Sequence, residues 1–153
     1  MTSANGQTRS ERQIRTLIDD LAIAIRIKDV DALMGHYAPD VLTFDLLPPL
    51  QYSGADAIRK RVSDWFSSFE SPIGFAMLNL SITAGDDVAF CHSLNGVSGA
   101  SRDGATIDMW WRATNCFRKI DGEWLVTHGH SSEPFDMESG KALLDLKPRK
   151  ASQ

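Results

Sequence analysis

One carboxylate, Asp45, has the surroundings that proton-transfer chemistry requires. It follows an apolar run at residues 41–44 and precedes an apolar, proline-containing run at residues 46–50. A carboxyl group held between apolar segments is partly desolvated, and desolvation raises its pKa toward the range of an efficient proton shuttle. We therefore expect Asp45 to be a catalytic residue in a pocket. The alternative is an aspartate that caps a turn at the end of a strand.

A second catalytic candidate, His92, depends on how two strands pair. If a two-residue loop at residues 103–104 joins these strands, His92 lies directly opposite Asn115 and Phe90 lies opposite Phe117. An apolar face that carries a His–Asn pair is typical of a ligand pocket. A β-bulge in the first strand would change this register. The alternative for His92 is a core histidine whose ring is hydrogen-bonded.

Two further histidines, His128 and His130, form an H-x-H pattern near the end of the sequence. They alternate along a predicted strand and therefore share one face of it. The pattern is that of a possible metal pair, but no third ligand is evident, so we predict no metal site. A two-residue turn at 121–122 places His128 opposite Asn115, inside the pocket. A turn one residue longer directs both histidines outward, to a possible dimer interface.

Aromatic residues supply the apolar surface of the expected site. Trp65 lies in a predicted helix, whereas Trp111 and Phe117 lie in a predicted strand, and all three are expected in the pocket or the core. Neither Cys91 nor Cys116 has a motif of activated nucleophiles around it, so we expect reduced thiols. The sequence also lacks the G-x-S-x-G, P-loop and G-x-G-x-x-G motifs, and we predict no cofactor.

The elements that must position these residues follow from apolar periodicity. Ile14, Leu17, Ile18, Leu21 and Ile25 recur at helical spacing, and Ser10 is the expected N-cap of their helix. Helices are predicted at 11–28, 29–36 and 55–68, and strands at 41–44, 75–84, 88–98, 105–119 and 123–132. Helices first and antiparallel strands afterwards predict an α+β fold, with the helices on one side of a curved sheet.

Length and charge narrow the function classes. The chain has 153 residues, which predicts one domain over 1–153, with a core at about 10–133 and a C-terminal extension at 134–153. Its net charge is −4 and its basic residues are scattered, so we expect no nucleic-acid partner. No apolar run reaches the length of a membrane span and no signal peptide is evident, so we expect a cytoplasmic protein without membrane contact.

Three segments resemble the nuclear transport factor 2-like superfamily, and within it the SnoaL-like and ketosteroid isomerase-like proteins. They are D-V-D-A-L-M-G-H-Y-A-P-D-V-L-T-F-D at 29–45, S-G-A-D-A-I at 53–58 and F-R-K-I-D-G-E-W at 117–124. The resemblance implies a cone-shaped, cystatin-like roll, in which three N-terminal helices pack on a strongly curved, mixed, mostly antiparallel sheet around an apolar pocket. It also implies a homodimer that is packed through the sheet.

The resemblance assigns roles to several residues. Asp45 matches the general base of ketosteroid isomerase, and Asn115 matches its protonated aspartic acid, whose hydrogen bond an asparagine amide can also donate. Leu21 replaces the tyrosine that is the enzyme's other donor. The match favours outward histidines at 128 and 130, with Thr127, Gly129 and Ser131 facing the pocket.

The function that the resemblance implies is small-molecule binding. Such a protein is either a cofactor-free isomerase, cyclase or lyase that acts on a small apolar carbonyl compound, or a non-catalytic dimeric module that binds a hydrophobic ligand or a protein. The expected ligand-binding residues are Asn115, Trp65, Phe90, Trp111, Phe117, His128, His130 and Ser131.

Overall fold

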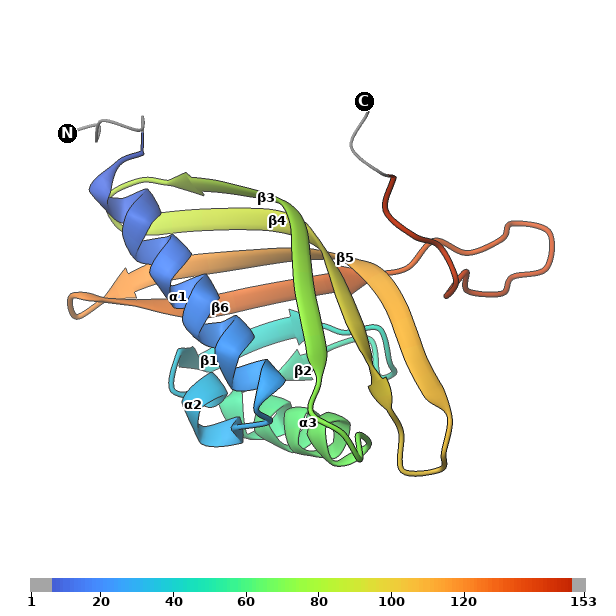
Figure 1. The fold of residues 1–153 in the computed structure, drawn as a ribbon. Coiled ribbons are helices and arrows are strands. Elements are labelled where there is room, and N and C mark those ends of the chain that lie inside the picture. The colour runs from blue at the N-terminus through green and yellow to red at the C-terminus, as the bar shows by residue number, and fades with distance from the viewer. Residues whose placement is uncertain (1–6, 150–153) are drawn as a thin grey trace.

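The computed structural model describes residues 7–149 of the chain, which contain three helices and six strands (Figure 1). The predicted domain of 1–153 also includes residues 1–6 and 150–153, which lie outside this described part. In chain order the elements are α1 (Arg9–Arg26), α2 (Val30–Met34), β1 (Tyr37–Phe44), β2 (Tyr52–Ser53), α3 (Ala55–Ser67), β3 (Gly74–Ala84), β4 (Val88–Ala100), β5 (Thr106–Ile120) and β6 (Glu123–Ser132).

The strands form a single mixed sheet with the order β2-β1-β6-β5-β4-β3. Strands β1 and β6 are parallel, and the other neighbours are antiparallel. The long strands bend strongly, and the helices lie on the concave side of the sheet (Figure 1). The predicted α+β class, with three N-terminal helices on a curved and mostly antiparallel sheet, is therefore confirmed.

The first helix is amphipathic and closes the concave face. Its buried side follows the predicted period, from Ile14 to Leu21. The N-cap is Thr8 and not the expected Ser10, because the Thr8 hydroxyl accepts a hydrogen bond from the N–H group of Glu11 and thereby satisfies one free donor of the first turn. The helix consequently starts two residues earlier than predicted.

Both shorter helices agree with the sequence. Asp29 caps α2 by accepting a hydrogen bond from the N–H group of Ala32, as expected. Helix α3 spans Ala55–Ser67, within one residue of its predicted end. Strand β1 begins at Tyr37, four residues before the prediction. Pro39, which has no N–H group, is tolerated because the pairing of β1 with β6 is interrupted between Tyr37 and Leu42.

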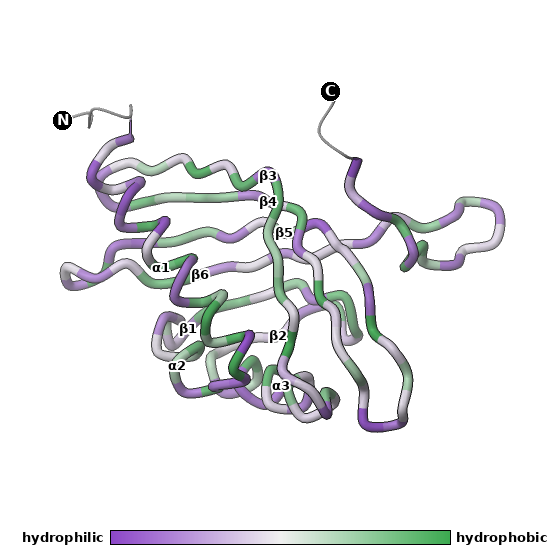
Figure 2. The backbone as a smooth tube through the Cα atoms, in the orientation of Figure 1, coloured by the Kyte–Doolittle hydropathy of each residue, from purple (hydrophilic) through white to green (hydrophobic). Residues whose placement is uncertain are grey.

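A continuous apolar core lies between α1 and the sheet. Its most deeply buried large side chains are Ile14, Val41, Phe69, Phe117 and Val126. Apolar segments recur along α1 and the long strands, as Figure 2 shows. The indole N–H group of Trp124 on β6 donates to the side chain of Gln13 on α1 at 3.0 Å, which attaches the helix to the sheet.

The C-terminal segment, residues 134–149, leaves the sheet after β6 and forms an irregular arm (Figure 1). Within the arm, Phe135 and Ala142 form an isolated bridge, and Leu143 N–H donates to Pro134 O at 2.8 Å. An ion pair between Nζ of Lys147 and Oδ2 of Asp108, at 2.9 Å, attaches the arm to β5. Although the arm is irregular, Ala142 and Leu144 return to the mouth of the cavity described below. No helix within residues 7–149 is long and apolar enough to cross a membrane.

Candidate functional site

A cavity of about 800 Å³ lies inside the cone, between the helices and the concave face of the sheet. This volume is in the usual range for small-molecule sites. Apolar side chains form most of its wall, including Ile18, Leu21, Ala22, Ile25, Ile58, Val62, Met77, Val97 and Met109. A cavity with this lining favours a ligand that is mainly apolar.

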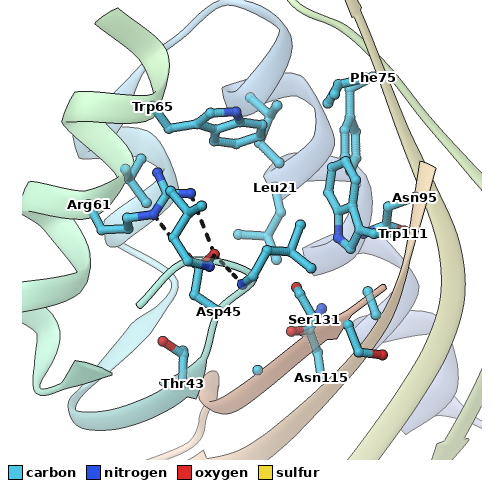
Figure 3. Close-up of a pocket in the computed structure, with 18 of the residues that line it drawn as sticks. Leu21, Thr43, Asp45, Arg61, Trp65, Phe75, Asn95, Trp111, Asn115 and Ser131 are labelled. Atoms are coloured by element: carbon cyan, nitrogen blue, oxygen red, sulfur yellow. Dashed lines mark hydrogen bonds and ion pairs between the residues drawn. The ribbon is translucent and has the colours of Figure 1, made fainter. Parts of the chain in front are cut away.

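Aromatic rings form one side of the cavity, as Figure 3 shows. Trp65 on α3 meets Trp111 on β5 edge to face, with ring centroids 6.4 Å apart. The ring centroid of Phe75 on β3 also lies 6.4 Å from that of Trp111. The predicted places of Trp65 and Trp111 on the cavity wall agree with the structure. Phe117 instead lies wholly buried in the core, which was the alternative for this residue.

Asp45 reaches the cavity directly after β1, but it is not the isolated carboxylate that its sequence context suggested. Its Oδ2 lies 3.1 Å from Nε of Arg61 on α3, and Nη2 of Arg61 donates to Oδ1 at 3.4 Å (Figure 3). The N–H groups of Leu46 and Leu47 also donate to Oδ1, at 2.5 and 3.4 Å. The side chains of the pair are only 20% and 24% exposed. The carboxylate is therefore fixed in orientation by a cation and two backbone donors.

A group of small polar side chains lies near this ion pair. Asn115 on β5 is paired with Gly129 on β6, and Gly129 in turn is paired with Thr43 on β1. All three residues, with Ser131, line the cavity (Figure 3). A Cβ atom at Gly129 would lie 2.9 Å from Oδ1 of Asn115, so the glycine leaves the space that this amide occupies.

Two hydrogen-bond donors on the wall were missed by the sequence analysis. Burial, with the nearby Asp45 charge adding to it, raises the pKa of Tyr37 to about 12, so its phenol keeps its proton. Asn95 accepts a hydrogen bond from the buried Ser93 hydroxyl at 2.7 Å through Oδ1, which leaves its amide nitrogen as a donor.

A second carboxyl group, Glu133, lines the cavity just after the end of β6. Its Oε1 is buried and has no hydrogen-bond partner within residues 7–149. Burial raises the pKa of Glu133, and the positive charge of Arg112 opposes this shift only in part. The signal in the sequence was its spacing, because Glu133 follows Ser131 by two residues and alternation continues the inner face.

A family model for the SnoaL-like domain matches residues 14–136. This chain belongs to the SnoaL-like domain family. The assignment agrees with the fold and with the superfamily that the sequence resembled. No functionally curated protein matches the chain significantly.

Solved structures give the same fold. An NTF2-like protein of unknown function from Pseudomonas putida KT2440 is 34% identical over 93% of this chain and 99% of that chain, with a TM-score of 0.84. A ketosteroid isomerase-like protein from Erwinia carotovora atroseptica SCRI1043 is 15% identical over 82% of this chain and 96% of its own, with a TM-score of 0.70. A protein with a cystatin-like fold from Caulobacter vibrioides is 15% identical, with a TM-score of 0.70 over 82% and 89% of the two chains. The last two comparisons support the fold alone.

The predicted register that placed His92 in the pocket is wrong for this SnoaL-like domain. Strands β4 and β5 are joined by a five-residue loop, 101–105, which a hydrogen bond from Ser101 N–H to Ala105 O closes at 2.9 Å. The register is therefore displaced by one residue, and Cys91 lies opposite Asn115. Because neighbouring residues of a strand face opposite ways, His92 and Phe90 lie on the outer face, where both are exposed.

The two histidines of the H-x-H pattern also face outward, although the turn before them has the shorter form. Ile120 pairs with Glu123 across the two-residue turn, in which both central residues have positive φ. A β-bulge then leaves Thr127 without a partner, because Phe117 pairs with Val126 but Cys116 pairs with His128. The bulge, and not the length of the turn, therefore decides which way these histidines point.

On the outer face the histidines pack around Phe44. Ring centroids of His128 and His130 lie 4.9 and 5.2 Å from that of Phe44, and Nδ1 of His128 lies 2.6 Å from the carbonyl oxygen of Leu42. Within residues 7–149 no group of three or more His, Cys, Asp and Glu side chains is placed to hold a metal ion. Neither histidine reaches the cavity wall.

Both cysteines are free thiols. Burial raises the pKa of Cys91 to about 11, and burial also raises that of Cys116. Because the thiolate is the nucleophilic form, these shifts act against cysteine chemistry. The chemically useful groups of the cavity are therefore its carboxyl groups and its hydrogen-bond donors.

Proposed function

We propose that this SnoaL-like domain binds a small, mainly apolar carbonyl compound in its cavity and that Asp45 moves a proton on it. One observation carries the proposal. Asp45 borders an apolar cavity of about 800 Å³, and Arg61 and two backbone N–H groups hold its carboxylate in a single orientation. A positioned carboxylate beside a bound carbonyl compound can act as a general base.

The proposed reaction is the removal of a proton from the carbon atom next to the carbonyl group. Asp45 takes this proton, and the electron pair of the C–H bond becomes the C=C bond of an enolate. The Asn115 amide, on the neighbouring wall, donates a hydrogen bond to the enolate oxygen (Figure 3). Asp45 then returns the proton to the same carbon or to another one, so that the net result is exchange or isomerisation.

The exchange of α-protons for deuterium tests this function directly. We expect the full chain to catalyse exchange of the methyl protons of 2-acetylnaphthalene in D₂O, as followed by ¹H NMR. Asp45→Asn keeps the size of the side chain but removes the base, and it should slow exchange by about 10²–10⁴-fold. Thermal denaturation of the variant shows whether the fold is retained, because the substitution also leaves Arg61 without its ion-pair partner.

A matched control is His92→Gln, which changes an exposed residue of the outer face. We expect it to leave both ketone binding and exchange unchanged, because His92 does not line the cavity. Equal exchange rates in the wild type and in a folded Asp45→Asn variant would contradict the role of Asp45. A wild-type protein that binds no ketone would contradict the proposal as a whole.

The alternative is a module that binds a ligand without transforming it. The observation in its favour is that Asp45 already accepts hydrogen bonds from two backbone groups and from Arg61, which leaves little of its carboxylate for a substrate. A thermal-shift screen of ketones and aromatic acids separates the two functions, because a ligand at 100 times its Kd stabilises the fold by about 2.7 kcal/mol. Stabilisation without any proton exchange supports the binding module.

We also propose the homodimer that the resemblance implies. It is supported by apolar side chains that the single chain leaves exposed on the outer face of the sheet, namely Leu78, Val88, Phe90 and Ile120. Analytical ultracentrifugation tests this proposal, and a monomer at micromolar concentration would contradict it.

A further inference from the structure

A second carboxyl group, Glu133, lines the same cavity as Asp45. Phe44 at the end of β1 pairs with His130 of the parallel strand β6. Asp45 therefore follows β1 where Ser131 continues β6, and Glu133 lies two residues beyond Ser131. Both carboxyl groups line the cavity. The cavity thus has two acidic residues in its lining.

The surroundings of the two carboxyl groups are opposite. The carboxylate of Asp45 is paired with a guanidinium and accepts backbone hydrogen bonds. Glu133 has a buried oxygen, Oε1, without a hydrogen-bond partner in the described part of the chain. The C-terminal arm contributes only the apolar Ala142 and Leu144 to the cavity lining beside it. A buried polar atom without a partner in a native fold calls for an explanation, and a bound ligand is one.

We propose that Glu133 is the acid of this site, a neutral carboxyl group that donates its proton to the ligand's oxygen while Asp45 accepts one from the ligand's carbon. This inference deepens the proposed function and rests on it. Two carboxyl groups whose environments differ in this way are the usual basis of an acid–base pair in one pocket. Burial, which raises the pKa of Glu133, favours the protonated form that such a donor needs.

Asp45 and Glu133 together account for both protons that move in the proposed reaction. As Asp45 removes the α-proton, the electrons of the C–H bond form the C=C bond, and the carbonyl oxygen takes the proton of Glu133. The product is a neutral enol, with a protonated Asp45 and an ionised Glu133, and the reverse steps restore both residues. Arg112, whose Nε donates to the Ser132 hydroxyl at 3.1 Å, is the charge that stabilises the ionised form of Glu133.

The protonation state of Glu133 also specifies the class of ligand. A protonated Glu133 offers a donor, so the site favours neutral compounds with an accepting oxygen, such as ketones, over hydrocarbons of the same shape. The charged groups that act on the two carboxyl groups are Arg61 on α3, which is paired with Asp45, and the exposed Arg112 on β5, whose charge acts on Glu133. The model ligand for a test is therefore an uncharged ketone.

The test compares two probes of similar shape, 2-acetylnaphthalene and 2-isopropylnaphthalene, by quenching of tryptophan fluorescence in the full chain. We expect the wild type to bind the ketone about tenfold more tightly than the hydrocarbon, as one good hydrogen bond allows. Glu133→Leu should lower this preference severalfold, with Asn115 as the remaining donor, and leave the affinity for the hydrocarbon unchanged. Glu133→Gln, whose amide still donates, should keep the preference.

Two further measurements distinguish an acid, which transfers its proton to the ligand, from a group that only donates a hydrogen bond. The preference for the ketone should decline in the wild type as the pH rises and Glu133 loses its proton, but it should stay constant in Glu133→Gln. The same variant should bind 2-acetylnaphthalene normally and exchange its methyl protons about 10²-fold more slowly, because it has no proton to give.

The outcomes distinguish this inference from the function on which it rests. If the wild type binds neither probe, the proposed function fails and the inference fails with it. If the probes bind but Glu133→Leu retains the full preference for the ketone, only the role of Glu133 is overturned. The same holds if Glu133→Gln exchanges protons at the wild-type rate or shows the wild-type dependence on pH.

Discussion

The two faces of the sheet differ in a way that hydropathy did not reveal. The inner face carries neutral groups such as Asn95 and Asn115, which line the cavity. The outer face carries His92, His128 and His130, of which His92 and His130 are exposed to solvent. Histidine, the residue type most often used in acid–base catalysis, therefore lies where nothing encloses a ligand. In this fold, a position on the cavity wall, more than residue type, decides which side chains can act on a ligand.

The largest effect that follows from this difference concerns two phenylalanines. Phe117 is fully buried on the inner face, whereas Phe90 on the outer face is 46% exposed. We expect Phe117→Ala to lower the free energy of unfolding by about 3–5 kcal/mol, because it leaves a cavity in the core. Phe90→Ala should cost less than about 1 kcal/mol in the monomer. Urea denaturation measures both, and equal losses would show that the assigned faces are wrong.

A smaller effect is expected at Gly129, on the inner face. Gly129→Ala would place a Cβ atom 2.9 Å from Oδ1 of Asn115, so the amide must move. We expect the affinity for 2-acetylnaphthalene to fall about fivefold, which corresponds to most of one hydrogen bond. Gly85→Ala is the control, since its Cβ atom would meet Val88 O at an ordinary 3.5 Å. Unchanged binding in Gly129→Ala would remove Asn115 from the ligand site.

The sequence was sufficient for the helices and the long strands but not for the short strand β2 or for the register of the sheet. Apolar periodicity located all three helices and the four long strands, because burial of one face imposes that period. Two local features then changed which residues face inward. One is the five-residue loop at 101–105, and the other is the bulge at Thr127. The loop displaces the register by one residue and the bulge inserts one residue, and neither alters the hydropathy pattern, so composition and alternation leave the register open.

The residues of the candidate site could likewise be predicted only in part. Asp45 and Asn115 were predicted in the pocket, and both line it. Arg61 was not predicted, since a charged residue on an amphipathic helix is normally solvated, and its ion pair exists only because α3 packs beside the end of β1. Placing Glu133 in the cavity lining required knowledge of which face of β6 Ser131 occupies, and that face depends on the bulge at Thr127.

A contact of His128 on the outer face of the sheet contributes to stability but not to binding. Nδ1 of His128 lies 2.6 Å from Leu42 O, a contact that joins β6 to β1. We expect His128→Ala to lower the free energy of unfolding by about 1 kcal/mol, the usual contribution of a hydrogen bond, and to leave ketone affinity unchanged. His130→Ala, which removes a neighbouring ring without such a contact, should cost less. A loss of ligand binding in either variant would place these histidines in the pocket after all.

The smallest effect on stability is expected at Glu133, and it depends on pH. The folded chain raises the pKa of this carboxyl above its ordinary 4.5, so it holds the proton more tightly than the unfolded chain does. Below that ordinary value both states are protonated. As the pH rises above it, the unfolded state loses its proton first, and the contribution of Glu133 to stability declines until the folded state also ionises. Glu133→Gln cannot ionise, so its melting temperature relative to that of the wild type should rise between pH 4 and pH 8. A difference that stays constant across this range, or one that falls, would show that Glu133 is solvated in the fold and is no acid for the ligand.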